Sequence, residues 1–253
     1  MAQVIFLGTA ASIPTKTRDT TSFIFRHKKL SFLVDCPGSI VHKLLKTNID
    51  FRKLSYIIIT HDHPDHYYGL FHLIHATAYL NKKLEIFTNK KVASLLSSLI
   101  RTMRLDRPPF PKVTFRDVFR KAFFYQVPSL KIKALKNKHI PLSFGIKFFF
   151  NKELVYSSDT ALSKEIIKES QSCDYVIHDC TASSTYFKKF PQLAAMHTDS
   201  HSLCCAFKNA KIKKLIPIHF LLLNAKEEQR IRRELKPLGK KTFIPFDFMS
   251  LHL

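Results

Sequence analysis

The sequence predicts an α/β protein that folds as one domain. Short apolar, β-branched or aromatic runs alternate with longer helix-like stretches along all 253 residues. Such alternation is typical of domains built from layers of strands and helices. The segment Arg107-Pro-Pro-Phe-Pro111 predicts a loop, but nothing around it has the composition of a linker. We therefore expect residues 1–253 to form a single domain.

The expected elements follow from these runs. Ten short runs are expected to be strands, at residues 4–7, 22–25, 32–34, 56–59, 130–135, 145–150, 154–156, 175–177, 215–218 and 243–246. Six stretches have the spacing of helices, at residues 40–46, 67–80, 91–101, 164–170, 203–209 and 226–235.

Composition excludes a membrane protein and disfavours an exported one. No apolar run approaches the ~20 residues of a membrane span. The start, Met1-Ala-Gln-Val-Ile-Phe-Leu7, has no basic segment and indicates a first strand rather than a signal peptide. The five cysteines are scattered and include no Cys-x-x-Cys pair. These observations predict reduced thiols in a soluble, cytoplasmic protein and argue against a zinc site built from cysteine.

The chain is strongly basic. Lys plus Arg number 41 against 19 acidic residues, a net charge of +22. Such a field attracts phosphate polyanions. The lysines are scattered, however, and no RNA-recognition, zinc-finger or helix-turn-helix motif accompanies them. Charge alone leaves two interpretations open, a nucleic-acid partner or a compositional bias on a solvated surface.

The segment that indicates chemistry is His61-Asp-His-Pro-Asp-His66, which directly follows the apolar run Ser55–Thr60. Imidazole nitrogen and carboxylate oxygen are both zinc ligands. Alternation lets His61 and His63 point the same way, while Asp65 and His66 can face a second ion. The alternative is a polar turn with incidental histidines. Four ligand-type side chains after one apolar strand disfavour it.

Polar residues also follow four later strands, at the edge where α/β folds build their sites. They are His139, Asp159, the pair His178-Asp179, and His219. Each alone is more often a structural residue. Together with the His61 segment they predict a site with enough ligands for two ions.

These motifs resemble the metallo-β-lactamase superfamily and, within it, the ribonuclease Z branch, over nearly the whole chain. Phe6-Leu-Gly-Thr9 through Pro14-Thr-Lys-Thr-Arg18 is similar to the opening strand and loop of that branch, with Asp19 where Asn is usual. The metal motif is matched by Thr60–His66. The remaining matches are Leu33-Val-Asp-Cys36, Val155-Tyr-Ser-Ser-Asp-Thr160, Ile177-His-Asp-Cys-Thr181, with Asp179 in place of Glu, and Lys214-Leu-Ile-Pro-Ile-His219.

The resemblance implies a four-layer αβ/βα sandwich of two mixed β-sheets with outer helices. It also implies two divalent ions, expected to be Zn²⁺, with Mn²⁺ or another divalent metal as the alternative. The implied ligands are His61, His63 and His139 for one ion, Asp65, His66 and His219 for the other, and Asp159 as the bridge.

The resemblance further implies that Asp65, Asp179 and His197 are catalytic. The branch uses a histidine held by the acidic residue at position 179, and both His197 and His201 are candidates here. His197 is favoured because it lies 22 residues before His219, as in the family pattern, and precedes Thr198. His201 falls at an expected helix start. The chosen histidine would protonate the leaving oxygen or stabilise charge on phosphorus.

The implied activity is that of a metal-dependent phosphodiesterase, a ribonuclease Z-like endonuclease acting on tRNA 3′ ends or related RNA. The first alternative is a phosphodiesterase for cyclic phosphates or cyclic nucleotides. Two departures support it: Asp159 lies only 20 positions after His139, which leaves too few residues for a tRNA-gripping arm, and Phe220-Leu-Leu222 replaces the usual Ser-Pro-Arg-Tyr. A glyoxalase-II-like thioesterase and a non-catalytic nucleic-acid-binding protein are weaker alternatives. Relatives are often homodimers, which by analogy predicts one here.

Overall fold

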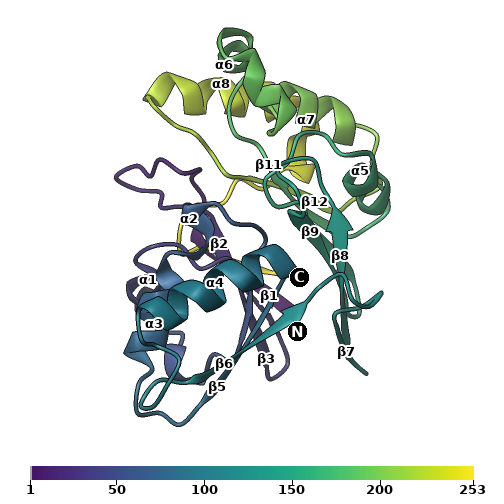
Figure 1. Cartoon of the computed structure of the whole chain (residues 1–253). Coiled ribbons are helices and arrows are strands. Elements are labelled where there is room, and N and C mark those ends of the chain that lie inside the picture. The colour runs from purple at the N-terminus through teal and green to yellow at the C-terminus, as the bar shows by residue number, and fades with distance from the viewer. Residues whose placement is uncertain (1) are drawn as a thin grey trace. The chain divides into compact units, whose positions relative to one another are not determined.

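The computed structural model describes residues 2–253, which divide into two compact units with one mixed β-sheet each (Figure 1). Unit 1 comprises the first strand up to Gly8, Thr20–Phe124 and Phe246–Leu253. Unit 2 comprises Thr9–Asp19 and Tyr125–Pro245. The single domain over residues 1–253 stays a prediction.

Unit 1 contains a seven-stranded sheet in the order β13-β1-β2-β3-β4-β5-β6. The strands β13, β1, β2 and β3 pair antiparallel, and β3 to β6 pair parallel. The strands are β1 (Ala2–Gly8), β2 (Ser22–His27), β3 (Leu30–Val34), β4 (Tyr56–Ile58), β5 (Lys83–Thr88), β6 (Lys112–Asp117) and β13 (Ser250–His252). The helices are α1 (Ile40–Lys46), η1 (Phe51–Lys53), α2 (Pro64–Tyr67), α3 (Gly69–Ala76) and α4 (Lys90–Thr102).

Helix α4 illustrates why these segments fold as they do. Asn89 caps its first turn, since the Asn89 side chain accepts a hydrogen bond from Val92 N at 2.9 Å. Val92, Leu96 and Ile100 then recur every four residues on one face, and all three are buried in the core of unit 1. The cap sets where the helix begins, and the apolar face sets how it packs.

Unit 2 contains a six-stranded sheet in the order β12-β11-β10-β9-β8-β7. Its strands are β7 (Tyr125–Val127), β8 (Leu130–Lys136), β9 (Phe144–Phe149), β10 (Glu153–Tyr156), β11 (Tyr175–Asp179) and β12 (Lys214–Ile218). Its helices are α5 (Lys164–Ser170), α6 (Ser184–Lys189), η2 (Pro191–Ala195), α7 (Ser200–Phe207), α8 (Ala225–Leu235) and η3 (Lys236–Lys241). Because β10, β11 and β12 are parallel, their carboxyl ends share one edge of the sheet.

Most expected elements are confirmed, and two are corrected. The strand expected at 243–246 is wrong: Thr242 makes only an isolated bridge to Leu215, and Pro245, which has no N–H to donate, follows. The helix expected at 67–80 is two helices, α2 and α3, which begin at Pro64 and end at Ala76. No helix within residues 2–253 is both long enough and apolar enough to cross a bilayer.

Gly69, at the start of α3, lies where two backbone segments of unit 1 approach closely. Its N–H donates to Cys36 O at 2.9 Å, and Cys36 N donates to His66 O at 2.7 Å. A Cβ on Gly69 would lie 1.9 Å from Pro37 O, which no backbone can accommodate without moving. The glycine therefore allows α3 to pack against the loop that precedes α1.

We expect Gly69→Ala to lower the free energy of unfolding by about 1–3 kcal/mol, because the added methyl group overpacks this contact. The matched control is Gly38→Ala, since a Cβ there meets no heavy atom within 4 Å. Urea unfolding of both variants measures the difference. Equal urea midpoints of unfolding would show that the loop moves to accommodate the methyl group without a loss of stability.

Candidate metal centre

In unit 1, the predicted ligands lie on one short loop and the helix after it. His61 follows β4, His63 is the N-cap of α2, and Asp65 and His66 lie within α2. The His61 ring centroid lies 4.7 Å from that of His63 and 4.0 Å from that of His66. Nε2 of His66 also lies 3.6 Å from Oδ2 of Asp65. The apolar strand and the proline at the start of α2 thus bring four ligand-type side chains together.

Asp35 directly follows β3, is fully buried, and contacts residues on both sides of His61. Its Oδ1 accepts hydrogen bonds from Thr60 N at 2.9 Å and Thr60 Oγ1 at 3.0 Å, and its Oδ2 lies 2.9 Å from Nδ1 of His66. Thr60 Oγ1 in turn lies 3.0 Å from Nδ1 of His61. Both rings are therefore oriented through Nδ1, which leaves Nε2 as the atom for a metal. Asp35 was not among the site residues predicted from the sequence, although it too is a polar residue directly after a strand.

We expect Asp35→Asn to weaken metal binding by about 10–100-fold, because it replaces the carboxylate that orients His66. Asp50→Asn is the control, since Asp50 caps η1 and pairs with the exposed Arg52. Metal affinity measured by competition with a chromophoric chelator compares the two. Unchanged affinity in Asp35→Asn would remove Asp35 from the support of the site.

In unit 2, a second set of predicted ligands surrounds Asp159, which is 2% exposed. Oδ2 of Asp159 lies 3.0 Å from Nε2 of His219 and 3.9 Å from Nε2 of His139. Nδ1 of His139 faces Met196 O at 3.0 Å, and Nδ1 of His219 faces the Thr181 hydroxyl at 3.1 Å. The Nδ1 atoms of His139 and His219 therefore have protein partners, and the Nε2 atoms of both rings lie near Oδ2 of Asp159.

The backbone around these residues is held by contacts from distant segments. His219 follows β12 and has a left-handed backbone, with φ 68°. The next residue, Phe220, donates its N–H to Thr9 O at 3.0 Å and accepts from Ala11 N at 2.9 Å. The Asn137 side chain donates to the carbonyl of Asp159 at 3.0 Å. These bonds fix a conformation that a non-glycine residue seldom adopts.

Asp179 and His197 form a pair beside the same set. Oδ2 of Asp179 lies 2.9 Å from Nδ1 of His197 and also accepts from Thr160 N, while Oδ1 accepts from the Thr181 hydroxyl at 2.7 Å. The shorter Asp therefore reaches the histidine at normal hydrogen-bond distance. The His197 ring stacks on His219 with centroids 5.1 Å apart.

His201 lies elsewhere, on the exposed side of α7, where Asp199 caps the helix. Its Nε2 is 3.6 Å from Sγ of Cys205. Of the two candidate histidines, His197 is the one that contacts Asp179.

The two sets suit a divalent metal. All donors are imidazole nitrogens or carboxylate oxygens, the ligand types that zinc and similar ions take. Within unit 2, Asp159, His197 and His219 each offer an atom, and these atoms lie within 4.8 Å of one another. The chemistry of the donors thus fits the predicted metal.

Comparison with known proteins places the chain in a family. Residues 2–220 match the family described as anti-Pycsar protein Apyc1. The chain belongs to this family. It is also similar to proteins named ribonuclease Z: it is 22% identical to that of Archaeoglobus fulgidus, with 99% of this chain and 97% of that protein covered, and 24% identical to that of Bacillus subtilis, with 99% of both covered.

Solved structures agree on the fold of this Apyc1-family chain. Human tRNase Z, short form, superposes with a TM-score of 0.79 at 18% identity, covering 99% of this chain and 98% of the other. The metallo-β-lactamase fold protein YhfI of Bacillus subtilis superposes equally well, at 19% identity with the same coverage. A diphosphatase of the PhnP family follows with a TM-score of 0.78 at 15% identity, covering 100% of this chain and 98% of the other. The predicted metallo-β-lactamase fold, with two mixed sheets flanked by helices, and the resemblance to ribonuclease Z are confirmed.

The Apyc1-family chain is shorter than the similar ribonuclease Z proteins. Its alignment with the Bacillus subtilis protein runs over 307 positions, whereas this chain has 253 residues, so at least 54 of those positions have no counterpart here. Between His139 and Asp159 the structure has only the hairpin of β9 and β10.

Proposed function

We propose that this Apyc1-family chain is a metal-dependent phosphodiesterase of the ribonuclease Z type, which cuts RNA at tRNA 3′ ends or in related precursors. The observation that carries the proposal is the Asp179–His197 pair, which lies against the ligand His219 and so beside the metal donors. The similarity to proteins named ribonuclease Z over 99% of the chain supports the substrate class.

We propose that the chain binds two divalent ions, expected to be zinc. His61, His63 and His139 would hold one ion, Asp65, His66 and His219 would hold the other, and Asp159 would be the shared ligand. The two donor sets described above support this assignment, because the Nδ1 atoms of four histidines face protein partners and leave Nε2 for a metal: His61, His66, His139 and His219. When bound, such ions lower the pKa of water and neutralise charge on the phosphoryl oxygens.

His197 is proposed to move the proton that the leaving oxygen requires. The carboxylate of Asp179 only accepts hydrogen bonds, so it keeps a proton on Nδ1 of His197. A second proton on Nε2 then makes the ring an imidazolium, which Asp179 stabilises and which can donate to the leaving oxygen. Thr160 N and the Thr181 hydroxyl hold the carboxylate in place for this role.

A phosphodiesterase for small cyclic phosphates or cyclic nucleotides is the second candidate. It is favoured by the short hairpin between His139 and Asp159, since no arm is present there to grip a folded RNA. The two weaker alternatives, a glyoxalase-II-like thioesterase and a non-catalytic nucleic-acid-binding protein, have no such support.

The deciding measurement is kcat/KM for a precursor tRNA and for a cyclic nucleotide, each at low and at physiological salt. We expect precursor tRNA to be cut, with activity falling steeply as salt rises, because a polyanion releases counterions on binding. If a cyclic nucleotide turns over and precursor tRNA stays intact at low salt, the second candidate replaces the first.

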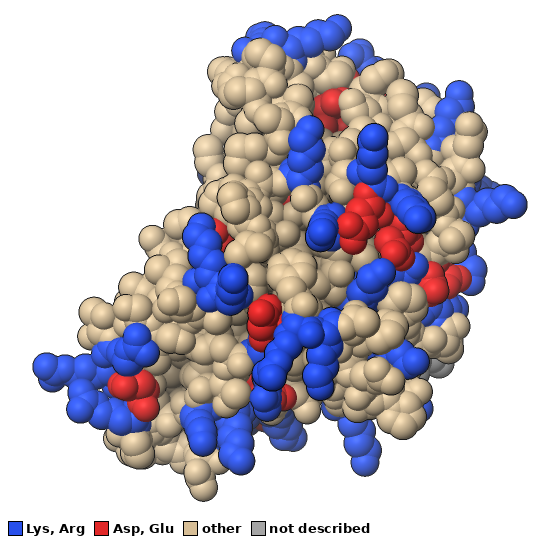
Figure 2. Space-filling model, turned by 45° about the vertical axis from the view of Figure 1, so that its right-hand side comes forward, with Lys and Arg blue, Asp and Glu red and all other residues tan. Residues whose placement is uncertain are grey.

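We also infer RNA as the partner and a cytoplasmic location. All five cysteines are free and four of them are buried, as expected in a reducing compartment. Lys and Arg side chains are scattered over the face in Figure 2, and in the sequence they outnumber Asp and Glu by 41 to 19, which suits a polyanion. The homodimer stays a prediction.

A further inference from the structure

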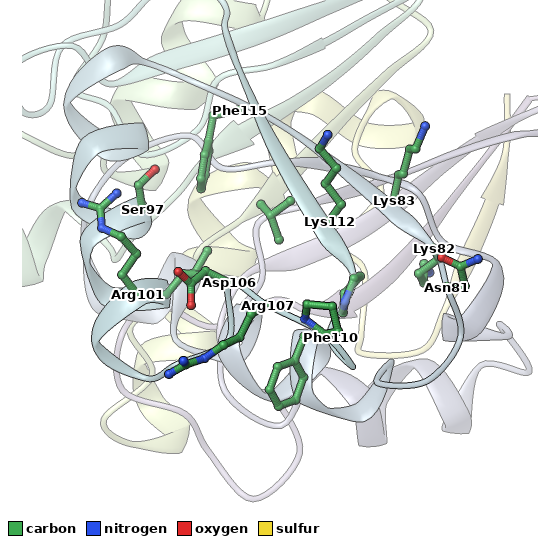
Figure 3. A pocket seen from close by; sticks show the side chains of 14 residues that line it. Asn81, Lys82, Lys83, Ser97, Arg101, Asp106, Arg107, Phe110, Lys112 and Phe115 are labelled. Atoms are coloured by element: carbon green, nitrogen blue, oxygen red, sulfur yellow. The ribbon is translucent and has the colours of Figure 1, made fainter.

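Unit 1 contains a pocket that the proposed chemistry does not use (Figure 3). Its volume is about 700 Å³, within the range of ligand sites. It is lined by α4, by the loop that follows α4, and by the first residues of β5 and β6. Since β4, β5 and β6 are parallel, the starts of β5 and β6 lie at the edge opposite the His61 loop, a strand length or roughly 20 Å away.

The pocket is basic, and its charges are not neutralised. Five cationic side chains line it, against one acidic side chain, Asp106, and four of the five are exposed. The four exposed cations are Lys83, Arg101, Arg107 and Lys112. Within residues 2–253 none of the four takes part in an ion pair, whereas Arg116 on β6 pairs with Glu85 at 2.8 Å. Clustered like charges without partners favour an anion in the pocket.

A fifth cation, Lys82, has a structural role instead. Its Nζ donates to backbone carbonyls of the η1 turn, including Arg52 O at 2.9 Å. Burial lowers the pKa of Lys82 to about 8. Lys82 thus links the start of β5 to the η1 turn, and this link stabilises the side of the pocket formed by the start of β5.

Two aromatic rings stand at opposite ends of the pocket, Phe110 and Phe115 (Figure 3). Both are half-buried and pack against the core of unit 1, so their positions are fixed. Phe110 also lies against His75, with centroids 5.6 Å apart. Cations for phosphates together with anchored rings for bases are the means by which proteins bind single-stranded nucleic acid. An acidic peptide would need only the cations.

We propose that this pocket binds a single-stranded stretch of RNA, with the four cations on its phosphates and Phe110 and Phe115 against its bases. The pocket lies far from the metal ligands of unit 1, so binding here grips RNA without taking part in cleavage. RNA binding at this pocket does not depend on the proposed activity, because no catalytic group takes part in it.

The test is fluorescence anisotropy of the full-length protein with a labelled oligouridylate of about 12 nucleotides, a length suited to such sites. The pocket variant combines Arg101→Gln, Arg107→Gln and Lys112→Gln. The control variant removes the same charge from exposed lysines of unit 2, by Lys188→Gln, Lys189→Gln and Lys208→Gln. A gel run after each titration confirms that the oligonucleotide is intact, and thermal unfolding confirms that both variants fold.

We expect the pocket variant to bind at least about tenfold more weakly, with the slope of log Kd against log salt reduced by about 2, as for three lost phosphate contacts. The control variant should keep most of the affinity. Photocrosslinks from the RNA should map to residues 97–115. Equal weakening in both variants, or crosslinks only outside this segment, would overturn the proposal.

Two further ligands test the chemistry of the occupant. Uridine monophosphate that binds as tightly as the oligonucleotide would show a mononucleotide site instead of a strand site. A poly-glutamate peptide that binds equally well, and loses affinity equally in the pocket variant, would show a site for acidic proteins. We expect both to bind much more weakly than the oligonucleotide.

Discussion

Replacing Asp159 with alanine is expected to abolish turnover and release bound metal. The Asp159 carboxylate lies within 3.0 Å of Nε2 of His219 and 3.9 Å of Nε2 of His139, where a shared ion would sit. Removing it should cost several kcal/mol of transition-state stabilisation, a loss of at least about 10³-fold in kcat/KM. Elemental analysis after dialysis measures the metal, and a small chromogenic phosphodiester measures the rate.

Asp174→Ala is the matched control, because Asp174 precedes β11 at the opposite edge of the same sheet. It accepts from Glu153 N at 2.9 Å and pairs with Lys213, which lowers the pKa of its carboxyl below the usual value. Its loss should reduce stability slightly and leave metal content intact. If both aspartates have equal effects on metal and rate, the bridging role of Asp159 is wrong.

His197→Ala is expected to lower turnover by about 10²–10⁴-fold while metal content is retained. The reason is that His197 is held by Asp179 and, in the proposed mechanism, would supply a proton to the leaving oxygen. The loss should be smaller for a nitrophenyl ester, whose leaving group needs little protonation. Rates for substrates with good and poor leaving groups, measured beside metal content, check this.

The control is His201→Ala, which removes an exposed side chain on α7 and should leave the rate unchanged. Metal loss in His197→Ala would instead make His197 a ligand, an assignment that its closeness to Asp159 and His219 also permits. A large loss of rate in His201→Ala would show that His201, and not His197, is the catalytic histidine.

Local patterns accounted for most elements and for the types of residue in the candidate site. Helix α1, helix α5 and strand β4 were predicted within a residue because their signals are contiguous. Strands β5 and β6 were missed, although Leu84 and Ile86, like Val113 and Phe115, alternate with charged or polar residues in the period of two that marks a strand. That alternation could have been recognised.

What the sequence by itself determined is the chemistry after each buried strand: His61 to His66 after β4, Asp159 after β10, Asp179 at the end of β11 and His219 after β12. A strand and the residues that directly follow it are joined covalently, so their proximity needs no tertiary contact.

Only the tertiary structure decided which distant groups meet. Asp35 reaches Thr60 and His66 because β3 and β4 pair side by side, and Asp179 contacts His197 rather than His201 because α7 begins after residue 199. Such contacts join residues about 20 to 30 positions apart in the chain. Sequence periodicity describes neighbours within a few residues, whereas these contacts depend on how strands pair and where helices dock.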